Sequence, residues 1–207
     1  MHHPPPAVRI DHLARTGGFT VVELIITLVV LGVLVALGVP AYTEFARNNR
    51  RAAVLNEFNA SLNLARSEAI KRGLQVAMCK TADGTTCGGN GVRWEQGWLV
   101  FVNRDGDAPA VVDVGETVLR VHREANPAFR LTSNLTSNDD VGAQTNFVSY
   151  TPDGSSSAVG RLTYCDARGL RSARAVIINS TGRPRLSQDI DSDGIDEDES
   201  GNDLTCN

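Results

Sequence analysis

The chain has 207 residues, 42% of them hydrophobic and only 5% aromatic, and its formal net charge at pH 7 is −4. This length fits one membrane helix and one soluble domain, and 19 glycines with so few aromatic residues argue against a helical bundle. All 20 Lys and Arg lie before residue 189, so the body carries +4 and the segment Asp189–Asp203 carries −8. Because body and tail differ in sign, the net charge alone excludes no class of partner.

An apolar run extends from Phe19 to Ala41 and contains only three polar residues, Thr20, Glu23 and Thr27. As a helix rising about 1.5 Å per residue, it is long enough to cross a bilayer core of roughly 30 Å. An unpaired carboxylate inside it costs on the order of 3 kcal/mol or more, so Glu23 requires a partner. A cut after Gly18 would give Phe19 a new α-amine on the same helix face as Glu23, in its own chain or in a neighbouring helix.

The motif Gly18-Phe19-Thr20-x-x-Glu23, followed by an apolar helix, resembles the prepilin cleavage site of type IV pilins and type II secretion pseudopilins. The resemblance implies that a membrane peptidase cuts after Gly18 and N-methylates Phe19. It also implies that Glu23 aligns each subunit with its neighbours in a helical filament. Pro40 falls where many pilins carry a helix-kinking proline. The alternative is an ordinary signal anchor that tolerates Glu23 near the membrane edge.

The segment Met1–Gly18, with Arg9 and Arg15 against Asp11, is expected to be a short cytoplasmic leader. A secretory signal would be cut after the apolar run, but no A-x-A-like site stands out beyond Ala41. We therefore expect a single-pass inner-membrane protein with a periplasmic C-terminal domain. The pilin resemblance then places the mature protein in the pilus, near its tip.

A helical pattern continues beyond Pro40 and predicts one long helix. Its apolar stripe steps by three or four residues through Arg51, Val54, Phe58, Leu62, Ala65 and Ala69. Gly73 follows Lys71 and Arg72 and is a good helix stop. The expected regions are a leader (1–18), a membrane half (19–41) and an amphipathic half (42–73) of the helix, a β-rich domain (74–188) and an acidic tail (189–207).

Short segments rich in β-branched or aromatic residues predict seven strands after Gly73. They are Gln75–Cys79, Trp98–Asn103, Thr117–Arg123, Phe129–Thr132, Phe147–Tyr150, Leu162–Cys165 and Ala173–Asn179. The expected fold class is α+β, a pilin-like fold with a long N-terminal helix packed on one antiparallel sheet or two small ones. Trp98 and Phe101 are expected in the core, Trp94 exposed and His122 on the surface.

Four further segments narrow the resemblance to the FimT/GspH family, which comprises the minor pilin FimT and the minor pseudopilin GspH. They are Asn49–Ala53, Leu62–Gly73, Gly97–Asn103 and Gly115–Arg120. The resemblance covers residues 17 to about 186 and is weakest in Asp153–Gly160.

The even number of cysteines suggests disulfides in an oxidising compartment, with three possible connectivities for Cys79, Cys87, Cys165 and Cys206. We favour Cys79–Cys87, which closes a short turn, and Cys165–Cys206, which tethers the tail. The alternative is free buried thiols. The spacing does not indicate a zinc site, because there is no Cys-x-x-Cys or nearby His pair.

No pattern indicates an enzyme. Three of the four histidines, His2, His3 and His12, lie in the leader, and no serine sits in a Gly-x-Ser-x-Gly motif. The glycines in Gly88–Gly91 read as a turn, not as a phosphate-binding loop.

A basic stretch near the C-terminus contains Arg161, Arg168, Arg171, Arg174, Arg183 and Arg185. The segment Thr181–Arg185 predicts a tight turn, because Pro184 restricts φ and Gly182 permits unusual φ values. Guanidinium groups bind phosphate in a bidentate manner, so such a turn could contact a DNA backbone.

The same residues resemble the Gly-Arg-x-Arg motif of FimT proteins that bind DNA during natural transformation, which implies that Arg183 and Arg185 contact DNA. Charge alone adds Arg171 and Arg174. The alternative is a solvated basic edge that keeps a strand from aggregating.

The acidic tail contains an Asp-x-Asp-x-Asp-Gly spacing typical of calcium loops, formed by Asp189, Asp191 and Asp193. The twelfth position is Ser200, so an EF-hand is not supported, but Glu197 could act as a ligand. Ca²⁺ in the tail is thus the one cofactor that the sequence suggests, and the predicted function requires no cofactor. The alternative is a disordered tail held only at Cys206, which could also cover the arginines. The turn Asp105-Gly106-Asp107 reads as a hairpin.

Together these patterns predict a minor type IV pilin that binds DNA without sequence preference for uptake in natural transformation. Its partners would be other pilins, the prepilin peptidase, DNA and, before assembly, the inner membrane. One alternative is a GspH-like pseudopilin of the type II secretion system without DNA affinity. Another is a minor pilin that only primes pilus assembly.

Overall fold

The computed structural model describes residues 18–124, 128–137 and 146–206, so the expected leader lies outside the described residues except for Gly18. The chain divides into two compact units, residues 1–48 and residues 49–207, and each is described by itself. The expected boundaries differ from this division, because the helix is shared between the two units and the acidic tail belongs to the second.

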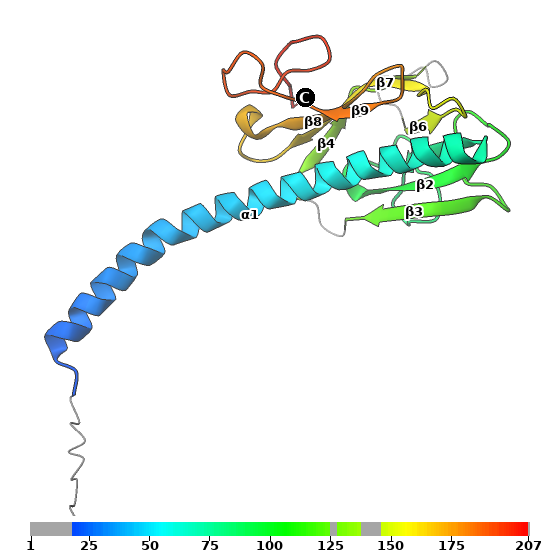
Figure 1. Cartoon of the computed structure of the whole chain (residues 1–207). Coiled ribbons are helices and arrows are strands. Elements are labelled where there is room, and N and C mark those ends of the chain that lie inside the picture. Colours follow the sequence, from blue (N-terminus) through cyan, green and yellow to red (C-terminus); the bar gives the residue numbers. More distant parts are fainter. Residues whose placement is uncertain (1–17, 125–127, 138–145, 207) are drawn as a thin grey trace, which may run out of the picture. The chain divides into compact units, whose positions relative to one another are not determined.

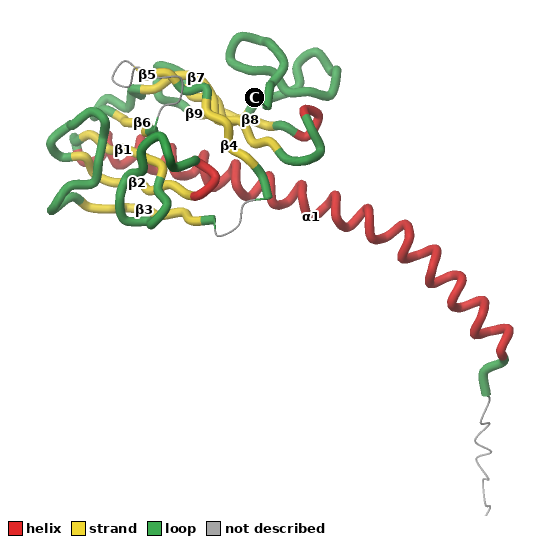
Figure 2. Tube along the Cα trace, turned by 180° about the vertical axis from the view of Figure 1, so that it is seen from behind, coloured by secondary structure: helices red, strands yellow, loops and turns green. Residues whose placement is uncertain are grey.

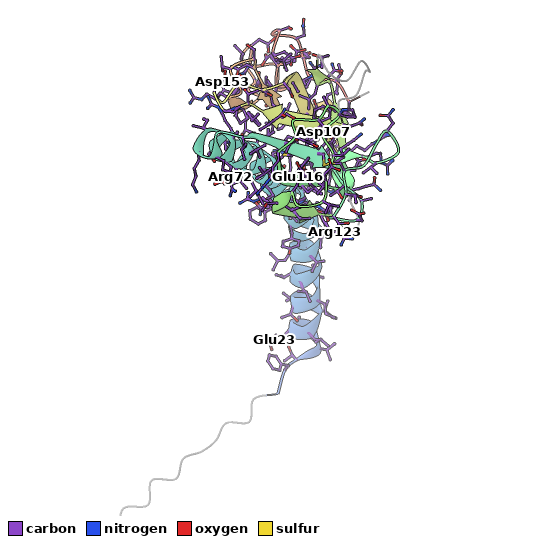
Figure 3. All side chains as sticks on the ribbon, turned by 90° about the vertical axis from the view of Figure 1, so that its right-hand side faces the viewer. Glu23, Arg72, Asp107, Glu116, Arg123 and Asp153 are labelled. Carbon is purple, nitrogen blue, oxygen red and sulfur yellow. A yellow bond between two sulfur atoms is a disulfide. The ribbon has the colours of Figure 1, made fainter. Side chains whose placement is uncertain are left out.

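The first unit contains the beginning of helix α1 (Val21–Arg72), coloured blue in Figure 1. The Oγ1 atom of Thr20 accepts a hydrogen bond of 3.2 Å from the backbone N–H of Glu23, so the helix starts just after this N-cap and not at Phe19. Its apolar side chains are exposed, and α1 is the one described helix long and apolar enough to cross a membrane. Figure 3 labels Glu23 near the start of this helix.

In the second unit, one face of α1 is buried. It consists of Val54, Leu55, Phe58, Ser61, Leu62, Ala65 and Ala69. The expected stripe is confirmed, and the polar Ser61 fits because Trp98 Nε1 donates a hydrogen bond of 3.0 Å to its Oγ. The helix ends at Gly73, whose φ of +65° is the left-handed conformation that glycine permits at a helix C-terminus.

Two antiparallel sheets pack with this helix. The first has the order β3-β2-β1-β6, formed by β3 (Thr117–Arg123), β2 (Gly97–Asn103), β1 (Gln75–Lys80) and β6 (Phe147–Tyr150). The second has the order β4-β7-β8-β9, formed by β4 (Arg130–Ser133), β7 (Ala158–Cys165), β8 (Arg174–Ile178) and β9 (Pro184–Leu186). The short β5 (Thr136–Ser137) also pairs with β7. Figure 2 shows both sheets beside the C-terminal part of α1, and the α+β fold class is confirmed.

One hydrophobic cluster joins the inner faces of both sheets to the helix. It contains Phe58 and Leu62 of α1, Trp98 and Val100 of the first sheet, and Leu162 of the second. The outer face of each sheet is also apolar, and a loop covers it. A sheet with two apolar faces must be covered on both sides. Ala110 and Cys87 belong to the loops that cover the first sheet, and Leu204 and Ile195 belong to the tail that covers the second.

Two expectations about the exposure of ring side chains need correction. Trp94 is not exposed: its exposed fraction is 2%, and its ring packs edge-on against Phe58 with centroids 5.5 Å apart. His122 is half-buried, because its ring stacks on Trp98 at 4.0 Å. Burial lowers the pKa of His122 below its ordinary value. Trp98 and Phe101 lie in the core, as expected.

The strand boundaries also differ from the expected ones at the C-terminal end. β7 begins at Ala158, four residues before the expected Leu162, and β5 and β9 were not expected. The segment around Pro184 was expected to be only a turn. As the edge strand of its sheet, β9 tolerates Pro184, because a proline there removes no N–H that the sheet needs.

Replacing Phe58 with Ala should lower the free energy of unfolding by about 3–5 kcal/mol, since it empties the centre of the shared cluster. Trp94 and Trp98 both contact this ring, so their fluorescence during urea unfolding reports the loss. As a matched control on the same helix, Ile70→Ala removes a side chain that is 51% exposed. It should cost about 1 kcal/mol or less. Equal losses in both variants would contradict the central position of Phe58.

Candidate nucleic-acid interface and acidic loop

The turn that joins β8 to β9 is held by its own polar groups. The backbone N–H of Gly182 donates to the carbonyl oxygen of Asn179 at 2.9 Å. The Oδ1 atom of Asn179 also accepts hydrogen bonds from Thr181 Oγ1 at 2.7 Å and from the backbone N–H of Arg183 at 3.2 Å. An asparagine that closes a turn in this way fixes where the following residues point.

Gly182 is required at this turn for two separate reasons. Its φ is +74°, a value that residues with a side chain adopt only at a cost. A Cβ atom placed on it would also lie 2.2 Å from the carbonyl oxygen of Gly154. The turn therefore packs directly against the loop that contains Gly154.

Helix α1 anchors both loops through one side chain. Arg66 Nε donates to the carbonyl oxygen of Gly154 at 2.9 Å, and Arg66 Nη2 donates to that of Thr181 at 3.3 Å. Two hydrogen bonds from one guanidinium fix the turn to the body of the domain.

The residues at the start of β9 differ in exposure. Pro184 is buried, whereas Arg183 and Arg185 are exposed. Ile177 of β8 lies opposite Arg185 on one side and Arg161 of β7 on the other. Because directly opposed residues share a face, Arg161 and Arg185 lie on the face of the sheet that carries Ile177.

Among the described residues, no ion pair or side-chain hydrogen bond of Arg183 or Arg185 is found. Their guanidinium groups therefore remain available for an anion in solution. This arrangement agrees with a sequence pattern that presents both arginines, although the turn presents Arg183 and the strand β9 presents Arg185.

The other two predicted arginines do not join this pair. Arg174 is at the far end of β8, and its Nε atom lies 3.2 Å from Asp196 Oδ1 in the tail. Arg171 is exposed, but its Nη1 atom lies close enough to Gly194 to touch a Cβ placed there. Both arginines thus face the acidic tail and not the β8–β9 turn.

The acidic tail is folded, which corrects the view of it as a disordered segment. Asp196, Glu197 and Leu204 are at most 4% exposed. Asp196 Oδ2 accepts a hydrogen bond of 2.6 Å from Ser187 Oγ, and the backbone N–H of Leu204 donates to the carbonyl oxygen of Asp196 at 2.9 Å. The loops of the tail, orange to red in Figure 1, lie beside β8.

Arg161 ties a second part of the tail to the sheet. Its Nη1 atom lies 3.2 Å from Asp198 Oδ2 and 2.9 Å from Glu199 Oε1. The side chain of Arg161 is only 10% exposed, so water screens these ion pairs less than surface pairs. Three acids of the tail therefore have arginine partners: Asp196, Asp198 and Glu199.

Five other carboxylates of the tail converge on one another. Ligand oxygens of Asp189, Asp191 and Glu197 lie within 4.8 Å of one another, as do those of Asp191, Asp193 and Asp203. These oxygens could hold a hard cation such as Ca²⁺, which takes six to eight oxygen ligands.

Asp203 was missed by the sequence reasoning. It lies outside the Asp-x-Asp-x-Asp-Gly spacing and joins the group because Glu197 and Asp203 form a β-bridge. The carboxylate of Asp193 raises the pKa of Asp203 above its ordinary value, with smaller contributions from burial and from Asp191. Crowded negative charge thus disfavours ionisation of this group.

A second acidic group lies in the loop after β2, where ligand oxygens of Asp105, Asp107 and Asp113 come within 4.8 Å of one another. The loop is closed by Glu116, which accepts hydrogen bonds from the backbone N–H groups of Arg104 and Asp113. Figure 3 labels Asp107 and Glu116 in this part of the molecule.

Both disulfides have the pairing that the sequence analysis favours. Cys79–Cys87 closes a loop over the first sheet, and Cys165–Cys206 joins β7 to the end of the tail. The partners are 8 and 41 positions apart in the sequence, so the second bond closes the longer loop and restricts the unfolded chain more.

The predicted processing site lies at the exposed start of the first unit. Gly18, Phe19 and Glu23 are all exposed, and the exposed fraction of Phe19 is 85%. Among the described residues, no atom lies within 4 Å of where a Cβ on Gly18 would be.

Comparison with known proteins gives one family and one kind of solved structure. The model of a family described as "Type II transport protein GspH" matches residues 54–182. Two crystal structures of the type IV minor pilin FimU from Pseudomonas aeruginosa are similar to the chain at 19% identity. They cover 70% and 66% of this chain and 92% of their own chains, with TM-scores of 0.47 and 0.43. The family match ends at Gly182, so Arg183, Arg185 and the tail lie beyond it.

Replacing Gly182 with Ala should lower the free energy of unfolding by about 2–4 kcal/mol, because it combines an unfavourable φ with a backbone clash. Gly169→Ala is the matched control: its φ is +83°, but no atom lies within 4 Å of the added Cβ. It should cost about 1–2 kcal/mol. Urea unfolding of the oxidised chain measures both. If the two variants lose the same stability, the contact between Gly182 and Gly154 is not a close one.

Proposed function

Because the chain belongs to the GspH family of type II transport proteins, we propose that it is a minor type IV pilin whose β-domain binds DNA. The family places the chain among minor pilins and pseudopilins, which are structural proteins and not a known class of enzymes. The observation that carries the proposal is the pair of exposed arginines at the turn into β9, Arg183 in the turn and Arg185 on the strand. The proposed role is DNA uptake in natural transformation.

The apolar start of α1 fits the membrane anchor and filament segment that this proposal requires. Cleavage after Gly18 by the prepilin peptidase would expose the α-amine of Phe19, which the same enzyme would methylate. The ammonium group would then pair with a Glu23 carboxylate in the same or a neighbouring subunit. Since an unpaired carboxylate is costly in the membrane, this pair favours the assembled filament of pilins. Before assembly, the chain would cross the inner membrane once with its β-domain in the periplasm.

The proposed DNA contact works through charge and geometry. Arg183 and Arg185 are only two residues apart in sequence, so their backbones lie at most about 7 Å apart, and both residues are exposed. Each can bind a phosphate with two parallel hydrogen bonds, which fixes the backbone but does not read the sequence. Released counterions make such binding weaker as the salt concentration rises.

A pseudopilin of the type II secretion system is the second candidate, and membership in a family of type II transport proteins favours it. Such a protein would use the same helix and the same Glu23, but would not bind DNA. DNA binding by the arginine pair therefore separates the two candidates.

We further propose that the acidic tail binds Ca²⁺ through Asp189, Asp191, Asp193 and Glu197, with Asp203 as an additional ligand. The carboxylates that converge here have no arginine partner among the described ion pairs. A divalent cation would offset their mutual repulsion, which the raised pKa of Asp203 reflects. Bound Ca²⁺ would stabilise the folded tail on the second sheet.

Replacing both arginines, Arg183→Ala/Arg185→Ala, should weaken binding of a DNA duplex by at least about tenfold, or about 1.4 kcal/mol. The slope of log affinity against log salt should fall by about 2, because two phosphate contacts are lost. Fluorescence anisotropy with the full-length chain in a nonionic detergent, at several salt concentrations, measures both quantities.

The matched control is Arg104→Ala/Arg123→Ala, which removes the same charge from exposed positions outside the second sheet. If this control weakens binding as much as the first variant, net charge and not the β9 face is responsible. Wild-type protein that binds no duplex at low salt would contradict DNA binding and favour the pseudopilin.

Calcium should raise the melting temperature of the chain. A stabilisation of about 2 kcal/mol at saturating Ca²⁺ corresponds to about 4–8 °C for a domain of this size. Asp191→Asn removes a carboxylate shared by both groups of ligands and should abolish the shift. The control Glu116→Gln changes an acid of the first-sheet loop and should retain it. An equal shift with Mg²⁺, or a shift that Asp191→Asn retains, would contradict the proposed site.

A further inference from the structure

An open groove lies on the second sheet beside the arginine pair. Its volume is about 870 Å³. It is lined by Asn134, Thr136, Val159, Gly160, Ile177 and Arg185, with Glu199 at its rim. Thr136, Val159, Ile177 and Arg185 come from β5, β7, β8 and β9, so the groove runs across the strands and not along them. With neighbouring strands about 4.8 Å apart, it crosses roughly 14 Å of sheet.

The floor of the groove is apolar where the tail leaves the sheet uncovered. Val159 is 39% exposed and Ile177 is buried. An apolar floor next to polar walls suits a flat ring that has an apolar face and a polar edge.

The charges around the groove favour an anionic occupant. Arg185 lines it, and Arg183 lies two residues earlier, in the turn that leads into β9. The one acid in its lining, Glu199, already pairs with Arg161 at 2.9 Å. The amide groups of Asn134 and Asn179 add hydrogen-bonding groups at the edges.

We propose that this groove receives unpaired bases of single-stranded DNA, while Arg183 and Arg185 hold the phosphates on either side. This inference rests on the proposed DNA binding and specifies the form of DNA that the same site prefers. Bases of a duplex are stacked and paired, so they cannot leave the helix without an energetic cost, whereas bases of a single strand can.

A single strand fits the groove better than a peptide strand. The groove lies on the face of the sheet, where β7 and β8 already pair on both sides. An added peptide strand needs free backbone groups at a sheet edge. Single-stranded nucleic acid instead lies across a sheet face and uses side chains for both bases and phosphates.

The experiment compares three probes: a short oligothymidine, an abasic strand of the same length and a duplex of the same length. Fluorescence anisotropy measures binding to the full-length chain in a nonionic detergent. The oligothymidine should bind about tenfold more tightly than the abasic strand, because only its bases enter the groove.

Val159→Asn makes the groove floor polar without changing charge. It should remove most of the preference for oligothymidine over the abasic strand and leave duplex binding within about twofold. Val111→Asn is the matched control, since Val111 is 40% exposed but lies in the loop after β2. It should keep the preference, and unchanged duplex binding shows that both variants are folded.

Equal affinity of the wild type for oligothymidine and the abasic strand would overturn the inference but leave duplex binding by the arginine pair intact. The same holds if Val159→Asn keeps the preference, or if Val111→Asn loses it equally. Failure to bind any of the three probes at low salt would instead overturn the proposed DNA binding itself.

Discussion

The buried stripe of α1 is the constraint on which the rest of the domain depends. Phe58 and Leu62 belong to one buried cluster with residues of both sheets, so neither sheet has a complete core without the helix. Each sheet then has a second apolar face, and a loop secured by a disulfide covers it. The Cys165–Cys206 bond therefore makes the acidic tail part of the domain core, not an appendage.

The same packing determines which arginines can meet an anion. Where the tail covers the second sheet, Asp196 pairs with Arg174 and Asp198 pairs with Arg161. These ion pairs neutralise the charge of both arginines. The tail leaves part of this sheet face uncovered. There, Arg185 lines an open groove. A strongly acidic segment and an exposed arginine beside a groove thus coexist on one sheet, because Asp196, Asp198 and Glu199 pair with arginines of that sheet.

Features set by short-range rules could be predicted from the sequence. They include the apolar run with Glu23, the helix end at Gly73 and the sharp turn at Gly182, because each depends on neighbouring residues. Trp94 was misplaced, since its burial arises from a short 3-10 helix (Trp94–Gln96) that packs on Phe58. Asp203 was missed because only the folded tail brings it to Asp191 and Asp193. The groove was not foreseen, because it is formed by four strands distant in sequence.

The central claim is that Arg183 and Arg185, and not the more numerous arginines nearby, contact DNA. Nuclear magnetic resonance of the arginine Nε–Hε groups during titration with a short duplex tests this claim most directly. The account predicts that the resonances of Arg183 and Arg185 shift in proportion to bound DNA, while those of Arg161 and Arg174 stay in place with their carboxylate partners. Shifts confined to Arg161 and Arg174, or no shift of any arginine while DNA is bound, would contradict it.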